Sequence, residues 1–522
     1  MGLFLKLEMK LSLEKINEAI NSISNSIDQG EWVEALLGSE MMLSELEKHE
    51  TSNIVLKLYF NLASQFIDVG TYLKNTDSIL KGIQILEKNS EYFEKDFNIT
   101  YFYNLANGKL SLANNCGYSK EEVSFKNIEL FNEVKNLYWK AFKLINKSQD
   151  YDLYQQNLIN LANVLKQQFR FSEALQIYNL VIKQNTIYPQ AWLNRSSCLE
   201  QFDRLLDHRS HKMIIEIIKG YDFSSKSKLV PSDWKPYYAH KSKFLSSQLG
   251  SKSLEQDELE TRKEYSSMSH FRQWCIEENL TLNIHGMYCP CIANERDNLT
   301  LLEGVISSGN ILQFEQYLNR IKAEFSLIRV LYYESKFTDN SQFDYESCYS
   351  ELDDQEIINI RYEKLRTCFR LCFSILDKLS IFLCQYFSLS TDKNTAFNNF
   401  WYKNKSSLEN KTNFGLIAIN SLICDLNEKN GQFGFYKIWR NALEHHLLFL
   451  VPDTFELSND SSHTYVKISD FENGLDNLLQ FTRSSIFSTV FAIVEDLRQK
   501  APKDKQNLIE VTVHKKEFKS FQ

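Results

Sequence analysis

An apolar seam with the spacing of an α-helix is the feature that most limits how this chain can fold. Between Ile358 and Tyr386, apolar side chains recur at steps of three and four residues, and Leu371, Ile375 and Phe382 widen the seam. Residues at this spacing lie on one face of a helix. A helix with so continuous an apolar face is buried in a bundle, so its aromatic side chains are expected to be core.

The rest of the chain favours helices as well. Shorter helical patterns occupy 311–335 and 414–426, and a longer one occupies 470–498, where Ser469 and Glu472 have the spacing of a capping box. The 522 residues include only 16 Gly and 6 Pro, which argues against a turn-rich β-sandwich and against a glycine-cradled nucleotide fold. The predicted fold class is therefore all-α.

The first 205 residues repeat themselves weakly. An Asn-Leu-Ala triplet recurs within three helical patterns, and a Glu-Ala-Leu triplet recurs in two others; the alanines of these echoes are Ala63, Ala106, Ala162, Ala35 and Ala174. A small residue at a fixed place lets two helices cross closely. The repeats therefore predict stacked helix pairs.

These echoes resemble tetratricopeptide repeats. The best match runs from Leu158 to Trp192, which lies 34 residues later and opens the next repeat at the family's period. Thr186 stands where that family usually has proline, and the earlier repeats carry insertions. The resemblance implies a helical solenoid over residues 1–205, with a concave face for a protein or peptide partner; a generic helical bundle is the alternative.

Residues 206–298 change character. Pro231, Pro236 and a polar run over 246–258 predict an irregular connector or docking segment. The segment holds candidate zinc ligands: Cys275, His285, Cys289 and Cys291. The Cys-x-Cys spacing is not that of a zinc knuckle and no second pair follows, so structural thiols are expected, and no metal.

A helical bundle is predicted over residues 299–500, followed by a tail at 501–522. The tail region is rich in Lys and Arg and is expected to be a solvated extension, with a short strand at 511–513.

A polar constellation stands out within the bundle. Arg440 and Asn441 are followed by His445 on an expected helix, which Pro452 would end. Asn441 and His445 share a face because they are four residues apart, and the long side chain of Arg440 can reach it. A fixed cation, an amide and a group that titrates near neutrality are suited to handling a phosphodiester. The alternative is a simple surface ion pair between Arg440 and Glu444.

This pattern, Arg followed by His after four to six residues with a polar residue behind the Arg, resembles the signature of HEPN domains. The resemblance covers about 299–500, and the segment around Trp274–Asn283 resembles the connector of repeat–HEPN fusions in microbial defence systems. It implies a metal-independent endoribonuclease without cofactor, acting as a homodimer. A defence or toxin effector, controlled or targeted through its repeat domain, is the implied setting.

The family's roles fall on three residues of this chain. Arg440 would hold the scissile phosphate, His445 would transfer the proton, and Asn441 would orient the ribose or phosphate. His446 also falls within the family's spacing and is, with Glu444, a secondary candidate. Because some HEPN domains only bind nucleotides or partners, a non-catalytic interaction module is the main alternative.

Charge and excluded motifs bound the remaining possibilities. The net charge of −8 gives no global basic footprint for nucleic acid, so RNA contact needs a local patch. The P-loop, HExxH and GxSxG motifs are missing from the sequence. Scattered cysteines in apolar stretches, such as Cys368, Cys372 and Cys384, indicate a reducing compartment. No apolar run approaches the length of a membrane span, so a cytoplasmic protein is expected.

Overall fold

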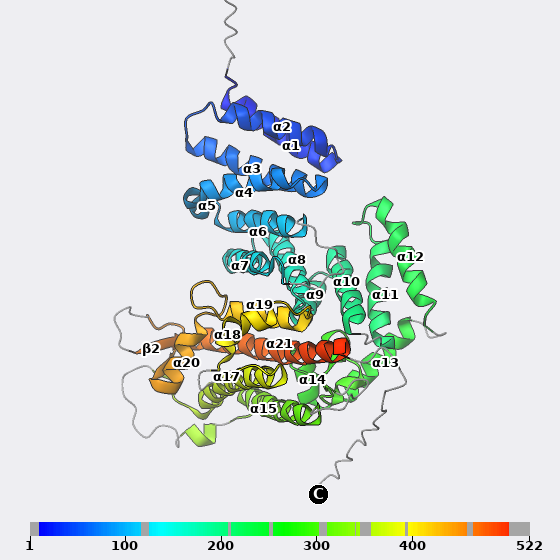
Figure 1. Ribbon diagram of the computed structural model, residues 1–522, viewed down its shortest axis with the longest axis vertical. Coiled ribbons are helices and arrows are strands. Elements are labelled where there is room, and N and C mark those ends of the chain that lie inside the picture. The colour runs from blue at the N-terminus through cyan, green and yellow to red at the C-terminus, as the bar shows by residue number, and fades with distance from the viewer. Residues whose placement is uncertain are drawn as a thin grey trace, which may run out of the picture. The chain divides into compact units, whose positions relative to one another are not determined.

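The computed structural model confirms an all-α fold (Figure 1). It describes residues 10–115, 125–206, 210–249, 254–301, 311–339, 341–344, 356–391, 395–456 and 463–500. The chain divides into two compact units, Met1–Leu165 and Lys166–Gln522. The division falls inside α8, earlier than the boundary at 205 that the repeat pattern suggested.

The first unit is a succession of helices joined by short loops. Its helices are α1 (Leu13–Gln29), α2 (Trp32–Leu46), α3 (Asn53–Leu73), α4 (Thr76–Lys88), α5 (Ser90–Asp96), α6 (Asn98–Asn115), α7 (Ile128–Leu144) and the greater part of α8 (Tyr151–Gln167). Side-chain oxygens of Ser12, Ser52 and Asn75 cap α1, α3 and α4 by accepting backbone N–H bonds. Each of α1, α3 and α6 packs against the helix that follows it or the next but one, as in a stack of pairs (Figure 1).

The recurring alanines lie in helix interfaces. Ala35 is 1% exposed, and Ala63, Ala106 and Ala162 are fully buried. At such positions a larger side chain would push neighbouring helices apart, because helix axes approach to about 8–10 Å only where the contact residues are small enough. The spacing of these alanines therefore indicated which faces of the helices are buried.

The second unit begins with the end of α8 and the helices that follow it. These are α9 (Phe171–Gln184), α10 (Pro189–Leu206), α11 (His211–Lys226), the short 3₁₀ helix η1 (Ser232–Trp234), α12 (Lys235–Ser246), α13 (Leu254–Ser267) and α14 (His270–Glu277). The expectation of an irregular connector at 206–298 was therefore wrong for most of its length. Pro236 lies in the first turn of α12, where proline is compatible with a helix, so it did not indicate a break.

The residues after α14 are irregular, as expected, and include the short 3₁₀ helices η2 (Ile284–Met287) and η3 (Ile292–Glu295). A carboxylate that is only 11% exposed, that of Asp297, holds this segment in place. It forms an ion pair with Arg329, lies 3.3 Å from Arg272 and accepts the backbone N–H of Leu282 at 2.8 Å. The same Arg329 donates to the carbonyl of Leu280 at 3.0 Å. Long-range polar bonds thus fix a segment that has little regular structure of its own.

A bundle of long helices follows. It consists of α15 (Ile311–Phe337), α17 (Ile360–Tyr386), α18 (Phe397–Leu408), α19 (Phe414–Asp425), α20 (Tyr436–His445) and α21 (Ile468–Lys500), with strands β1 (Leu448–Val451) and β2 (Thr464–Lys467). The seam helix α17 packs against α15 and α21. Its core positions Leu365, Phe369, Cys372 and Leu376 are at most 1% exposed, which confirms that the seam is buried within the helix. Ile358, the first residue of the predicted seam, precedes α17 and is 38% exposed.

The last helix, α21, crosses α19 very closely. A Cβ added at Gly415 would lie 2.3 Å from the backbone nitrogen of Ala492, so only glycine permits this approach. The predicted capping box at its start was wrong. The helix begins at Ile468, directly after β2, and the N–H of Ser469 donates to Asp453 at 3.1 Å, while Glu472 pairs with Arg361 at 2.5 Å.

The stretch after His445 is a strand and not more helix, which corrects the expected stop at Pro452. Residues 448–451 form β1, which pairs in parallel with β2 from Leu448 opposite Thr464 to Val451 opposite Lys467. Within β1, Leu448, Leu450 and Val451 are buried and Phe449 is half-buried, so this short strand is covered on both faces. Pro452 follows the strand, so it ends β1 and has no part in ending α20.

The buried cysteines, the helix lengths and the C-terminal tail bear on three further predictions. The cysteines of α17, Cys368, Cys372 and Cys384, are fully buried. Among the described residues, no helix has the length and apolarity that crossing a membrane requires. The tail at 501–522, with its expected strand at 511–513, lies outside the described residues.

Candidate functional site

The short helix α20 is fixed to the bundle by its aromatic side chains. Tyr436 is fully buried and its hydroxyl donates to the carbonyl of Gly474 on α21 at 2.6 Å. Burial raises the pKa of Tyr436 well above its ordinary value, so this phenol stays protonated as a donor. A Cβ at Gly474 would lie 2.5 Å from the Trp439 ring, so glycine lets that ring lie against the α21 backbone. These contacts fix the helix on which the candidate site residues stand.

The C-terminal end of α20 is held from the other side by α17. The guanidinium of Arg370 donates to the carbonyl of Leu443 in the last turn. Arg366 donates to the carbonyl of Leu448 at 3.0 Å, just beyond the helix. Carbonyls at a helix end lack intrahelical partners and carry partial negative charge, and Arg370 satisfies the one at Leu443. Arg366 binds the first residue of β1 instead. The position of residues 443–448 is therefore set by α17.

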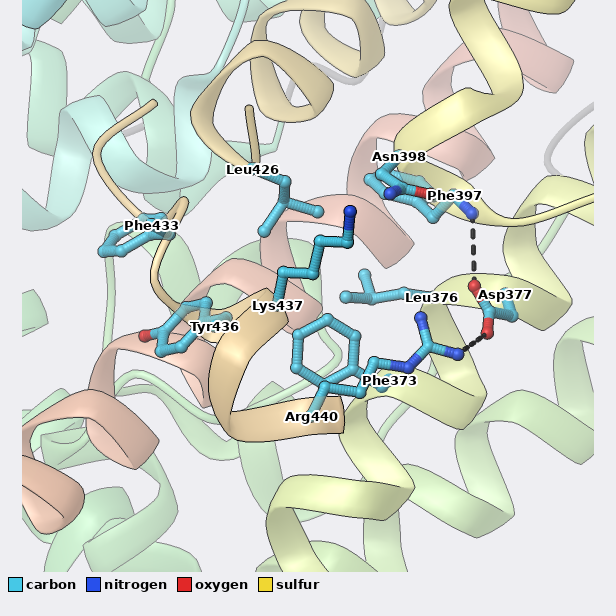
Figure 2. Close-up of a pocket in the computed structure, with 10 residues that line it drawn as sticks. All are labelled: Phe373, Leu376, Asp377, Phe397, Asn398, Leu426, Phe433, Tyr436, Lys437 and Arg440. Atoms are coloured by element: carbon cyan, nitrogen blue, oxygen red, sulfur yellow. Dashed lines mark hydrogen bonds and ion pairs between the residues drawn. The ribbon is translucent and has the colours of Figure 1, made fainter. Parts of the chain in front are cut away.

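Arg440 points from α20 toward α17 and is bound there (Figure 2). Its Nη2 lies 2.8 Å from Oδ2 of Asp377, and its guanidinium carbon lies 5.2 Å from the ring centroid of Phe373. The other oxygen of Asp377, Oδ1, accepts the backbone N–H of Phe397 at 3.1 Å. The side chains of Arg440 and Asp377 are 35% and 26% exposed, so the pair is reached by solvent. Arg440 thus has a fixed direction and keeps donors that Asp377 does not use.

A shallow pocket opens beside this ion pair (Figure 2). Its floor is apolar and its rim carries two cations, Arg440 and Lys437, together with the carboxylate of Asp377 and the amide of Asn398. Lys437 is paired with Glu428. The apolar lining residues are Phe373, Leu376, Phe397, Leu426, Phe433 and Tyr436. Two cations above aromatic side chains can receive a phosphate with an attached base or sugar.

Asn441 and His445 lie on the exposed side of α20. The structure therefore brings them to one helix face, as their spacing predicts. Within the described residues, neither side chain has a hydrogen-bonding partner, so both are accessible to a ligand. His446 is exposed too but is the residue that ends the helix, with extended backbone angles of φ −137° and ψ −156°. It therefore leaves the face that His445 occupies.

The alternative ion pair between Arg440 and Glu444 is not the one formed. Arg440 binds Asp377, and the partner of Glu444 is Arg370, whose Nε lies 3.8 Å from the Glu444 carboxylate. Both side chains of the second pair are nearly half exposed, so that contact contributes little to stability. Glu444 thus helps to orient Arg370 at the end of α20.

The cysteine-rich connector forms a second polar cluster. Cys291 Sγ lies 3.3 Å from His285 Nδ1. A hydrogen bond with Cys289, and then His285, lower the pKa of the Cys291 thiol below its ordinary value, although burial by itself would raise it. Burial raises the pKa of Cys275 to about 11. In the described parts of the chain, no three His, Cys, Asp or Glu side chains gather in a way that could hold a metal ion.

The comparison with protein families covers the bundle. Residues 306–496 match the LA2681-like HEPN family. The matched segment contains α15, α17, the pocket and the whole Arg440–His445 motif, and it agrees closely with the bundle that the sequence predicts at 299–500. The match does not include the N-terminal repeats. No curated protein matches the chain.

The sequence did not reveal two residues of the candidate site. Asp377 stands on α17, 63 residues before its partner, and Lys437 lies one turn before Arg440. A signal for Asp377 was present, because it and Lys378 interrupt an otherwise apolar stretch of the seam helix. That signal does not indicate a partner, since only the packing of α20 on α17 brings Arg440 to it.

Proposed function

We propose that this protein is a metal-independent endoribonuclease of the HEPN type. The observation that carries the proposal is the arrangement on α20: an accessible amide and imidazole on one face, Asn441 and His445, beside a guanidinium held in a fixed direction by Asp377. The family match to residues 306–496 supports it, because HEPN domains with an Arg…His motif are commonly ribonucleases.

The roles follow from the chemistry of each group. RNA carries its own nucleophile, the 2′-hydroxyl, so cleavage needs a base for that proton and a cation for the charge that develops on the phosphate. His445 would take or return the proton, and Arg440 would bind the phosphate oxygens with the donors that Asp377 leaves open. Asn441 would orient the ribose or phosphate. The strand is then cut by attack of the 2′-oxygen on phosphorus, which releases the 5′-oxygen and leaves a 2′,3′-cyclic phosphate.

The same face supports a homodimer as the active form. Ile438 stands three residues before Asn441 and seven before His445, so all three share one side of α20. Ile438 and Leu447 are each 62% exposed, so large aliphatic side chains stand on and just beyond this helix. A two-fold dimer through this face would cover both and bring two copies of the motif together.

The N-terminal helices would recognise a partner molecule that controls the nuclease or directs it to its target. Their tetratricopeptide-like pattern suits a protein or peptide partner, and control through such a partner fits a toxin or defence effector. The competing function is a non-catalytic module that binds a nucleotide or a protein. The ion pair between Arg440 and Asp377 is the observation that favours this alternative, because a phosphate would have to compete with the Asp377 carboxylate for the guanidinium.

The deciding experiment is cleavage of total RNA by purified full-length protein in excess EDTA, with His445→Ala beside it. We expect fragments that end in a 2′,3′-cyclic phosphate from the unchanged protein and no fragments from the variant, while DNA of the same sequence stays intact. Equal cleavage by both proteins, or cleavage only with added Mg²⁺, would overturn the assignment. Absence of cleavage together with tight nucleotide binding would support the non-catalytic module.

A further inference from the structure

Helix α12 carries an exposed face on which aromatic and basic side chains alternate. Tyr237 and Phe244 are 53% and 59% exposed, and Trp234, in the 3₁₀ turn that leads into the helix, is 58% exposed. His240 and Lys243 are exposed between them, at the spacing that places all of these residues on one side of the helix. From Lys235 to Ser246 there is no acidic residue. The chain as a whole is acidic, so this helix is a local exception.

The opposite face of α12 is anchored to its neighbours within the same unit (Figure 1). Ser242 and Leu245 are buried against α11, which packs along α12. Lys241 reaches Glu200 of α10 at 2.8 Å and lies 4.8 Å from the ring centroid of Tyr221. The anchoring contacts therefore use Lys241 and leave the outer face of α12 without a protein partner in the described structure.

The aromatic rings beneath this face form a short stack. Tyr221 and Tyr238 lie nearly parallel, with ring centroids 6.1 Å apart and planes at 15°. Trp234 continues the series on Tyr238 at 6.4 Å and 25°, and Trp234 is the exposed member at its end. A further planar ring could extend the stack at Trp234. The ring of Tyr237 is the second exposed aromatic ring of this face. The ammonium group of Lys241 lies 5.7 Å from its centroid, at the distance of a cation–π contact.

Cations are available beside the rings. Lys235 and Lys243 have no acidic partner among the described residues, whereas Lys241 and Lys226 are paired with Glu200 and Asp222. Single-stranded nucleic acid is bound by two kinds of interaction, stacking of its bases on aromatic rings and contact of its phosphates with cations. Exposed rings between unpaired lysines provide both. The rings require bases that are free of a duplex, as RNA loops present them.

We propose that the α12 face, defined by Trp234, Tyr237, His240, Lys243 and Phe244, binds single-stranded RNA. This surface lies on elements other than α20, and its binding does not depend on cleavage. A lipid surface fits less well, because His240 and Lys243 separate Tyr237 from Phe244 and interrupt the apolar face that insertion into a bilayer interface requires. A protein partner would not need the unpaired lysines.

The test measures binding by fluorescence anisotropy, using the full chain with His445→Ala and EDTA so that the RNA is not consumed. The probe is a labelled RNA hairpin with an open loop, and a fully paired RNA duplex is its comparison. Trp234→Ala and Tyr237→Ala should each weaken hairpin binding about 5- to 100-fold, as loss of one stacked base does. Tyr237→Phe should restore it, since the ring remains. Lys243→Ala should reduce the slope of log affinity against log salt by about 0.7.

The matched control is Tyr72→Ala on α3, an aromatic of similar exposure at 57% without this pattern around it. Hairpin binding that is unchanged in both Trp234→Ala and Tyr237→Ala overturns the proposal, as does equal affinity for the duplex. Capture of the protein by anionic phospholipid vesicles through Trp234, without hairpin binding, would assign the face to a membrane and overturn it as well. Because the readout is binding, a failure here is distinct from a failure of the proposed cleavage, which only the His445 comparison tests.

Discussion

The guanidinium of Arg440 on α20 is held by the carboxylate of Asp377 on α17, with Nη2 and Oδ2 2.8 Å apart. Asp377 itself is fixed by the backbone N–H of Phe397. The cation is therefore preorganised beside the pocket before any ligand arrives, which is a favourable arrangement for stabilising charge that develops in a transition state.

Substitutions of Arg440 and Asp377 should distinguish the effect of the positive charge of Arg440 from the effect of its fixed position. Arg440→Ala should reduce RNA cleavage by about 10²-fold or more, because the cation is lost. Asparagine at 377 is neutral and carries an NH2 group in place of one of the two oxygens that Phe397 N–H and Arg440 use. Asp377→Asn should therefore release Arg440 and slow cleavage by about 10- to 100-fold. Both variants should keep the melting temperature within a few degrees, since the pair is partly exposed. Single-turnover rates and thermal unfolding check this; faster cleavage by Asp377→Asn would instead identify Asp377 as a competitor of the phosphate.

The two adjacent histidines should differ strongly. His445 shares its helix face with Asn441, whereas His446 ends the helix with extended backbone angles. We expect His445→Ala to lower cleavage by about 10²- to 10⁴-fold, the usual loss of a general acid or base, and His446→Ala to have a mild effect. Asn441→Ala should fall between them, because it orients and transfers no proton. Rates of the three purified variants provide the comparison, and a larger loss in His446→Ala than in His445→Ala would reassign the proton transfer.

The largely buried carboxylate of Asp297 should make stability depend on acid pH. Burial by itself would raise the pKa of Asp297, but Arg329, Arg272 and the N–H of Leu282 together lower it below its ordinary value. Its stabilisation is therefore complete above the unfolded value of about 4 and is lost as pH falls through the lower folded value. At neutral pH, Asp297→Asn should reduce the free energy of unfolding by about 3–5 kcal/mol.

Urea unfolding of Asp297→Asn and the unchanged protein should show this difference near pH 7 and a shrinking difference below about pH 4. Glu258→Gln is the control, because Glu258 forms an exposed pair with Arg262 and should change stability by less than about 1 kcal/mol. A difference for Asp297→Asn that is independent of pH would contradict a role for its ionised form.

A second buried ion pair should matter for stability without touching the site. Arg170, at the start of α9, lies 2.5 Å from Asp425 at the end of α19, and both side chains are at most 2% exposed. Asp425→Ala removes one of the two carboxylates that bind this buried guanidinium and leaves Glu173 as the other. The free energy of unfolding should therefore fall by about 1.5–3 kcal/mol, the range for a lost hydrogen bond to a charged group. Asp222→Ala, which breaks the exposed pair with Lys226, should cost under about 1 kcal/mol. Denaturant midpoints measure both, and equal effects would show that Arg170 finds other partners.

The spacing of apolar and polar residues along the sequence determined which segments form helices and which side chains share a helix face. The seam at 358–386 specifies a buried helix because spacing alone sets which side chains share its face, and α17 follows it almost to the residue. The spacing of Asn441 and His445 likewise placed them on one side of α20. The family match to residues 306–496 agrees with the bundle that these patterns indicate.

Tertiary structure decided what depends on distant partners. Leu448–Val451 is a strand because Thr464–Lys467 pairs with it, and no helix propensity in the sequence reports that pairing. Asp377 became a partner of Arg440 only when α20 packed on α17, and Asp297 gives the segment after α14 its order by binding Arg329 across the fold. The physical reason is common to all three: hydrogen bonds and ion pairs between segments depend on which surfaces meet, and a local pattern does not contain that information.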